Sequence, residues 1–194
     1  PRIGVITNIG EAHIENFKNV KGIAEAKSEI IKNIQKNGTI ILNRDDKFFN
    51  YLEKKAKIKN LKVVTFGVNN SSDVCLKKVI TKKKNKVLTI RINNQIFKII
   101  INNINYYNVL SSLALLKELN LKFSQILNFY KNIEPTEGRG KIHKIYRYKK
   151  KFNLIDESYN ANPLSVKNAI RNFNSIKKEN FKKYLLLGDM LELG

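Results

Sequence analysis

The sequence predicts an α/β fold in which a parallel sheet with helices carries a small antiparallel subsheet and is followed by the start of a second α/β domain. Residues 3–9 (IGVITNI) are mostly apolar and predict a buried strand, and a helix separates them from a second strand expected at Thr39–Asn43. Residues 62–102 contain four short β-rich stretches, a pattern typical of antiparallel hairpins. The strand–helix–strand alternation favours parallel pairing, with ligands bound at the carboxyl ends of the strands.

The first helix is expected to start at Val20 and to stop at Gly38. Lys27 lies on its apolar stripe, and burial of an unpaired ammonium costs several kcal/mol. Lys27 is therefore a candidate functional residue; the alternative is a shallow stripe past which the long side chain reaches water. The stripe itself consists of Val20, Ile23, Ala24, Ile30, Ile31 and Ile34.

The remaining elements follow from turn residues and apolar spacing. Asp45 and Asp46 lie in an LNRDD turn that we interpret as structural, because Asp forms local hydrogen bonds to the backbone there. The stretch EPTEGRG (134–140) is expected to be a linker between a domain at residues 1–136 and a second at residues 137–194. The expected turns lie at 69–70, 84–85 and 93–94, the helices at 105–119, 124–132 and 163–176, and the later strands near 141–148, 152–155 and 184–187.

Composition limits the classes of partner. The net charge of +21 is that of a nucleic-acid-binding protein, but only 6 of the 37 basic residues are Arg, which is preferred for bidentate phosphate and base contacts. We therefore expect no specific binding of nucleic acid. The single cysteine, Cys75, cannot form an intrachain disulfide, and no apolar run reaches the roughly 18 residues of a membrane span. A reducing, cytoplasmic location without a membrane span is expected.

Three stretches resemble the Mur ligases, the ATP-dependent amide-forming enzymes of peptidoglycan assembly. The first is TNIGEAHIENF (7–17) with AEAKSEI (24–30), the second is NYYNVLSSLALL (105–116), and the third is DESYNANP (156–163) with LGDMLELG (187–194). The third resembles most specifically the branch that joins D-alanyl-D-alanine to UDP-N-acetylmuramoyl-tripeptide. The resemblance implies a central ATPase domain followed by the start of a Rossmann-like C-terminal domain.

The resemblance also implies a magnesium site in the first stretch. His13 matches a histidine that binds Mg²⁺ in the family, and Lys27 matches a lysine that is carbamylated (N6-carboxylated). A carbamate bears two oxygens, the hard donors that Mg²⁺ prefers, so the modified Lys27 would place a metal beside the reacting carboxylate. Asn8 lies on the matching TN-x-G turn, close to where the acceptor carboxylate is expected.

Nucleotide contacts are implied for the second and third stretches. Asn105 and Asn108 match a pair that holds the adenine of ATP; the alternative is that either one caps a helix, and Ile104 stands where the family usually has His. Arg139 matches a linker arginine near the nucleotide, with an exposed linker charge as its alternative. Glu157, where Asp is usual, and Asn160 match residues that reach ATP from the C-terminal domain.

The implied reaction transfers the γ-phosphoryl group of ATP to the tripeptide carboxylate, and the amine of D-alanyl-D-alanine then attacks the acyl phosphate. Because the chain begins at Pro1 and its GRGK (138–141) is followed by Ile142 rather than Ser or Thr, we expect the phosphate-binding loop upstream and an inactive isolated piece. The full-length form is expected to be a monomer. Two alternatives stay open: a folate-glutamylating ligase of the same superfamily, which typically has a DGAHNP-like run instead of DESYNANP, and a non-catalytic basic binding module.

Overall fold

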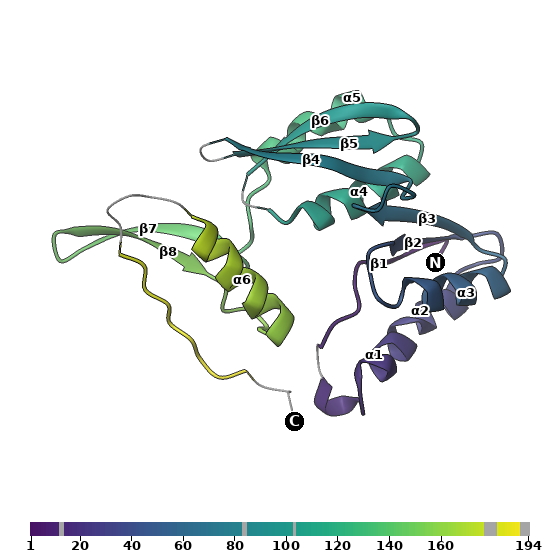
Figure 1. The fold of residues 1–194 in the computed structure, drawn as a ribbon, viewed down its shortest axis with the longest axis horizontal. Coiled ribbons are helices and arrows are strands. Elements are labelled where there is room, and N and C mark those ends of the chain that lie inside the picture. The colour runs from purple at the N-terminus through teal and green to yellow at the C-terminus, as the bar shows by residue number, and fades with distance from the viewer. Residues whose placement is uncertain (12–13, 83–84, 103, 177–181, 191–194) are drawn as a thin grey trace. The chain divides into compact units, whose positions relative to one another are not determined.

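The computed structural model describes residues 1–11, 14–82, 85–102, 104–176 and 182–190 (Figure 1). The chain divides into two compact units, which we call unit 1 (residues 1–9 and 24–134) and unit 2 (residues 10–23 and 135–194). The domain boundary expected between residues 136 and 137 remains a prediction. Among the described residues, no helix is long and apolar enough to cross a membrane.

Unit 1 is built on a six-stranded sheet with the order β1-β2-β3-β4-β5-β6. The pairs β1–β2, β2–β3 and β3–β4 are parallel, whereas β4–β5 and β5–β6 are antiparallel. The elements, in chain order, are β1 (Ile3–Ile6), α1 (Val20–Lys27, which starts in unit 2), α2 (Glu29–Asn33), β2 (Thr39–Asn43), α3 (Phe49–Ile58), β3 (Lys62–Gly67), β4 (Val74–Lys82), β5 (Asn85–Ile92), β6 (Gln95–Ile101), α4 (Tyr106–Glu118), α5 (Phe123–Ile126) and the 3₁₀ helix η2 (Leu127–Asn132).

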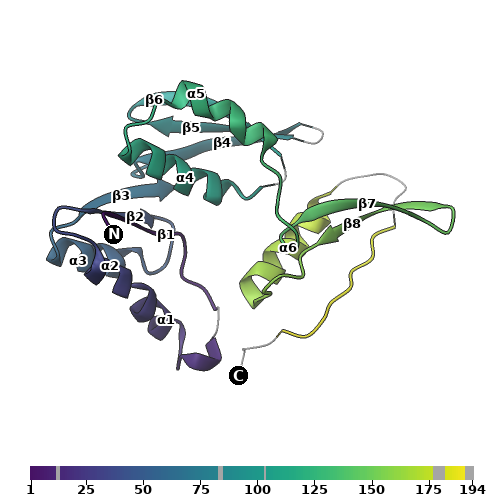
Figure 2. The same ribbon diagram turned by 180° about the vertical axis from the view of Figure 1, so that it is seen from behind.

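Strand β2 lies between β1 and β3 and is buried along nearly its whole length, as expected of a parallel strand covered on both faces. Both views of the ribbon show α2 and α3 on one face of the parallel strands and α4 on the other (Figures 1 and 2). The strand–helix–strand alternation predicted for the N-terminal part is confirmed. The carboxyl ends of β1, β2 and β3 therefore share one edge of the sheet, next to the start of α4.

The antiparallel strands pack one face against α4. Residues of β5 alternate between the core and the surface, since Leu88, Ile90 and Ile92 are fully buried while their neighbours are partly exposed. Leu110 and Leu113 on α4 are fully buried in the same cluster. The predicted turn at Asn93–Asn94 is confirmed: both residues have positive φ, as a two-residue hairpin loop of type I′ requires.

The structure corrects several local predictions for unit 1. The single helix expected from Val20 to Gly38 is two segments, α1 and α2, which meet at Ser28. The run VVTFG is strand β3, which pairs in parallel with β2 and with the start of β4, so Asn69–Asn70 is not a hairpin tip. Helix α3 was not predicted. The turn expected at 84–85 lies partly outside the described residues.

Unit 2 contains the 3₁₀ helix η1 (Ile14–Asn16), the antiparallel pair β7 (Lys141–Arg147) and β8 (Lys150–Asp156), and α6 (Pro163–Ser175). Asn162 caps α6 through a reciprocal capping box with Ser165, and Pro163 occupies the first turn, so this helix start is as predicted. The strand expected at 184–187 is not formed. Leu186 there is 98% exposed, and none of the described strands pairs with this segment.

Candidate functional site

The candidate site in unit 1 begins where β1 ends. Asn8 lies two residues after the end of β1, and the Nζ of Lys27 donates a hydrogen bond to the backbone carbonyl oxygen of Asn8 at 3.0 Å. The hydroxyl of Thr7 donates to Asn8 Oδ1 at 3.3 Å. Together with Ile30 and the last residues of β1, these side chains line a hollow of about 260 Å³. The structure thus brings together two of the residues singled out in the sequence, Asn8 and Lys27.

Lys27 is exposed, so the expectation that it occupies the buried stripe of its helix is wrong. Ala24, Ser28 and Ile31 form the buried line, and α1 ends at Lys27. The hydroxyl of Ser28 donates a hydrogen bond to the carbonyl oxygen of Glu25 at 2.6 Å. Ser28 is only 1% exposed, so it is the buried residue at the position on the helix where Lys27 was expected. The side chain of Lys27 is free to extend along the end of β1 instead.

The oxygen atoms at the end of β1 fit a hard cation by type. The carbonyl and side-chain oxygens of Asn8 and the hydroxyl of Thr7 are donors of the kind that Mg²⁺ prefers. The ammonium group of an unmodified lysine cannot ligate a metal, because it has a positive charge and no free lone pair. Lys27 therefore suits a metal only if it carries the carbamate. His13 lies outside the described residues, and no group of three or more His, Cys, Asp or Glu side chains suited to a metal occurs in the part of the chain that the structure describes.

The turn after β2 is held by two aspartates whose hydrogen bonds are mostly not local. Asp46 accepts from the backbone N–H of Ile9 at 2.7 Å and from that of Phe48 at 2.8 Å. Asp45 accepts from the N–H groups of Val68 and Asn69, at 2.6 and 3.0 Å. The structural interpretation of these aspartates holds, but four of the five bonds that their side chains accept, including one from the hydroxyl of Tyr107, join segments far apart in the sequence.

The start of α4 carries the two asparagines expected to hold adenine. Asn105 caps the helix, because its side-chain oxygen accepts the backbone N–H of Tyr107 at 2.9 Å, and Asn108 is exposed one turn later. The hydroxyl of Tyr107 donates to Asp45 Oδ2 at 3.1 Å. Partial burial, and next the Asp45 carboxylate, raise the pKa of Tyr107, which keeps this hydroxyl protonated as a donor.

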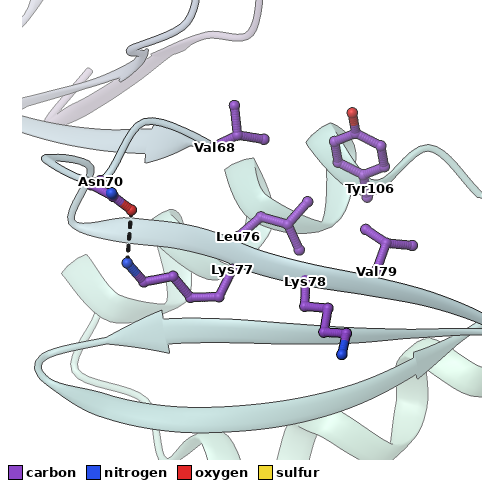
Figure 3. Close-up of a pocket in the computed structure, with 7 residues that line it drawn as sticks. All are labelled: Val68, Asn70, Leu76, Lys77, Lys78, Val79 and Tyr106. Carbon is purple, nitrogen blue, oxygen red and sulfur yellow. Dashed lines mark hydrogen bonds between the residues drawn. The ribbon is translucent and has the colours of Figure 1, made fainter.

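A second hollow, of about 350 Å³, opens beside the start of α4 (Figure 3). Tyr106 and Val68 stand over strand β4, and Lys77 extends along the strand and donates a hydrogen bond to Asn70 Oδ1 at 2.8 Å. Leu76, Lys78 and Val79 complete the lining. The hollow combines apolar and aromatic walls with cationic groups.

The candidate residues of unit 2 gather around the linker turn and the end of β8. The guanidinium of Arg139 lies 4.8 Å from the ring centroid of Tyr159, a cation–π arrangement. Asp156 accepts from the N–H groups of Ser158 and Gly138, both at 3.0 Å; hydrogen bonding to Ser158 first, and then to Gly138, lowers the pKa of Asp156. Burial, and then the neighbouring Asp156, raise the pKa of Glu157. Asn160 is exposed, with a φ of 45°.

Sequence reasoning missed two contributors to the unit 1 site. Tyr107 and Ile9 have no chemical signature of their own, and only the fold brings them to the LNRDD turn. The paired aspartates at the end of a predicted parallel strand were the available signal.

Comparison with known proteins places the whole chain in one family. Residues 1–116 match the Mur ligase middle domain. The UDP-N-acetylmuramoyl-tripeptide–D-alanyl-D-alanine ligase of Rickettsia prowazekii is 33% identical across the full chain, which covers 43% of that protein. The corresponding ligase of Bacillus subtilis is 30% identical, again over the full chain and 40% of that protein.

Solved structures of related proteins have the same fold as this chain. The crystal structure of MurF from Acinetobacter baumannii matches with a TM-score of 0.86 and 25% identity, covering all of this chain and 41% of that one. A folylpolyglutamate synthetase from Lactobacillus casei shares the fold at a TM-score of 0.65, with 14% identity over 92% of this chain and 43% of that chain. The chain spans about two fifths of the length of these relatives. It belongs to the Mur ligase family.

Proposed function

We propose that the chain is part of an ATP-dependent ligase that joins D-alanyl-D-alanine to UDP-N-acetylmuramoyl-tripeptide in peptidoglycan precursor synthesis. The observation that carries this proposal is the match of the full chain to relatives with that name, at 33% and 30% identity. The folate-glutamylating alternative is supported only by a shared fold at 14% identity. We further propose that the full-length enzyme is cytoplasmic and acts as a monomer.

The proposed reaction has two steps. The tripeptide carboxylate attacks the γ-phosphorus of ATP and ADP leaves; the amine of D-alanyl-D-alanine then attacks the acyl phosphate, phosphate leaves, and an amide forms with loss of a proton. Such chemistry depends on positioning and on neutralisation of negative charge. Bound Mg²⁺ would supply that neutralisation.

We assign the reacting end of the site to Asn8, His13 and Lys27. Lys27 is exposed and lines the hollow at the end of β1, so its amine is accessible to CO₂ for carbamate formation with release of a proton. The carbamate oxygens would then hold the metal together with His13, and Asn8 would orient the acceptor carboxylate. Positioning of this kind contributes several kcal/mol to catalysis.

We assign nucleotide contacts to Asn105 and Asn108 in unit 1 and, separately, to Arg139, Glu157 and Asn160 in unit 2. The cap bond of Asn105 uses only the side-chain oxygen, which leaves the amide NH₂ able to donate to a base. Arg139 is exposed and held against Tyr159, which suits a guanidinium that reaches phosphate oxygens. The carboxylate of Glu157 would contact the ribose with a longer arm than Asp.

The test is a ligation assay with the full-length protein, ATP, Mg²⁺, UDP-N-acetylmuramoyl-tripeptide and D-alanyl-D-alanine. ADP release should require both other substrates, and mass spectrometry should detect the pentapeptide product. Folate with glutamate serves as the competing substrate pair. Turnover with that pair alone would overturn the proposal.

The 194-residue chain by itself is expected to hydrolyse no ATP. Its sequence contains no glycine-rich loop with the GxxxxGK[ST] pattern whose backbone N–H groups cradle phosphates. Magnesium-dependent ATP hydrolysis by the purified chain would contradict this assignment of roles.

A further inference from the structure

The LNRDD turn touches both ends of the proposed unit 1 site. It follows β2, the strand that lies between β1 and β3. On one side Asp46 reaches the segment after β1, and on the other Asp45 reaches the end of β3 and the start of α4. A single turn therefore joins segments that carry different parts of the proposed chemistry.

The Asp46 side leads to Lys27 in three steps. Asp46 Oδ2 accepts the N–H of Ile9 at 2.7 Å, and Ile9 is buried, which anchors the chain just after Asn8. The carbonyl oxygen of Asn8 in turn accepts from Lys27 Nζ at 3.0 Å. Loss of the bond to Ile9 would release the segment that supplies the partner of Lys27.

The Asp45 side leads to the start of α4. Asp45 Oδ2 accepts both the N–H of Val68 and the hydroxyl of Tyr107, at 2.6 and 3.1 Å. Gly67 permits this approach, because a Cβ there would overlap the Asp45 carboxylate. Val68 also lines the second hollow, as does Tyr106, the neighbour of Tyr107 (Figure 3).

We propose that Asp45 and Asp46 are positioning residues that hold the Asn8–Lys27 end and the Asn105–Asn108 end of the site in register. This inference rests on the proposed function, which supplies the meaning of the two ends. Each aspartate acts on its own end: Asp46 on the reacting groups, and Asp45 with Tyr107 on nucleotide binding. Because the two aspartates bond different segments, their effects should be separable in kinetic constants.

The test uses Asp46→Asn and Tyr107→Phe in the full-length protein. The N–H groups of Ile9 and Phe48 donate to different oxygens of Asp46, and in Asn one of these oxygens becomes an NH₂ donor, so Asp46→Asn cannot keep both bonds in this geometry. The bond to Ile9, 37 residues away, is the one expected to be lost in favour of the turn's own bond to Phe48. We expect kcat to fall about tenfold with the KM for ATP within about twofold of wild type. Tyr107→Phe removes only the hydroxyl and should raise the KM for ATP about fivefold while kcat stays within about twofold.

Asp73→Asn is the matched control. Asp73 accepts from the N–H and the hydroxyl of Thr65 at 2.9 and 2.7 Å, which is the same chemistry in the same unit, and it has no bond to residues 8–9 or 105–108. It should lower the melting temperature and leave both constants near wild type. The inference is wrong if Asp46→Asn and Tyr107→Phe change the same kinetic constant. It is also wrong if their effects on kcat and on the KM for ATP are no larger than those of Asp73→Asn.

Hydrogen exchange separates this inference from the proposed function. Asp46→Asn should speed exchange of the Ile9 amide about tenfold and leave Val68 and Asn69 unchanged. Unchanged exchange at Ile9 would overturn the positioning role, whether or not the protein is a ligase. Faster exchange of the Ile9 amide in Asp46→Asn, combined with no ligation by the wild-type protein, would overturn the proposed function and leave the positioning role in place.

Discussion

Replacement of Ser28 with alanine should destabilise unit 1, because this side chain joins the α1–α2 junction to α3. Ser28 is 1% exposed; its hydroxyl donates to the Glu25 carbonyl oxygen at 2.6 Å and accepts from Lys55 Nζ at 2.8 Å. A hydrogen bond to a charged group contributes about 1.5–3 kcal/mol, but Lys55 is only half-buried and water can replace part of this bond. We therefore expect a loss of about 1–2 kcal/mol in the free energy of unfolding.

The assay is urea unfolding of the chain, followed by circular dichroism, in a double-mutant cycle with Lys55→Met. Methionine keeps an unbranched apolar stem of similar length and removes the ammonium. The neighbouring exposed residue Lys54, changed to Met, is the matched control. The cycle should give a coupling energy of at least about 0.5 kcal/mol for Ser28 with Lys55 and about zero for Ser28 with Lys54. Equal coupling in both cycles would refute the assigned bond.

Two further predictions concern stability. Burial alone would raise the pKa of Glu118, but the hydrogen bonds from Lys62 and Thr39 outweigh it and set the pKa below its ordinary value of 4.5. The stabilisation from the ionised form is therefore present above pH 4.5 and is lost as the pH falls through the folded-state pKa. Urea unfolding between pH 7 and 3 tests this: the free energy of unfolding of Glu118→Gln should depend less on acid pH than that of the wild type. Asn162→Ala removes the capping box with Ser165 and should cost α6 about 1 kcal/mol, seen as faster amide exchange at Ser165; unchanged exchange would contradict the cap.

The strands and helices with a clear pattern of apolar residues were predicted well from the sequence. Thr39–Asn43 matches β2 residue for residue, and α4 differs from the expected helix by one residue at each end. Whether a strand pairs in parallel or antiparallel was harder to predict, because the buried run VVTFG fits either kind of strand equally well. Helix α3 was missed, although Phe49, Leu52 and Ala56 recur at helical spacing on its buried face, because lysines surround them.

For the site, the sequence indicated Lys27 for a reason that the structure corrects. Periodicity placed it on a buried stripe, but the buried residue is Ser28, at the junction of α1 and α2, and Lys27 is exposed. The long-range bonds of Asp45 and Asp46 could not be predicted, since they depend on tertiary contacts with residues 9, 68 and 107. Asn105 as a helix cap, in contrast, was the alternative weighed from the sequence, and the cap bond is present.

We infer that Lys27 organises the reacting end of a ligase site, and the decisive measurement is the turnover of Lys27→Ala in the full-length protein. The rate of ATP-, tripeptide- and D-alanyl-D-alanine-dependent ADP release should fall by roughly 10²-fold or more, by analogy with losses of metal-positioning groups. Stability in urea should stay near wild type because the side chain is exposed. Lys21→Ala, an exposed lysine on the same helix, should keep normal turnover, and a short carboxylic acid should restore part of the Lys27→Ala rate. Near-normal turnover by Lys27→Ala would show that Lys27 does not organise the reacting end of the site.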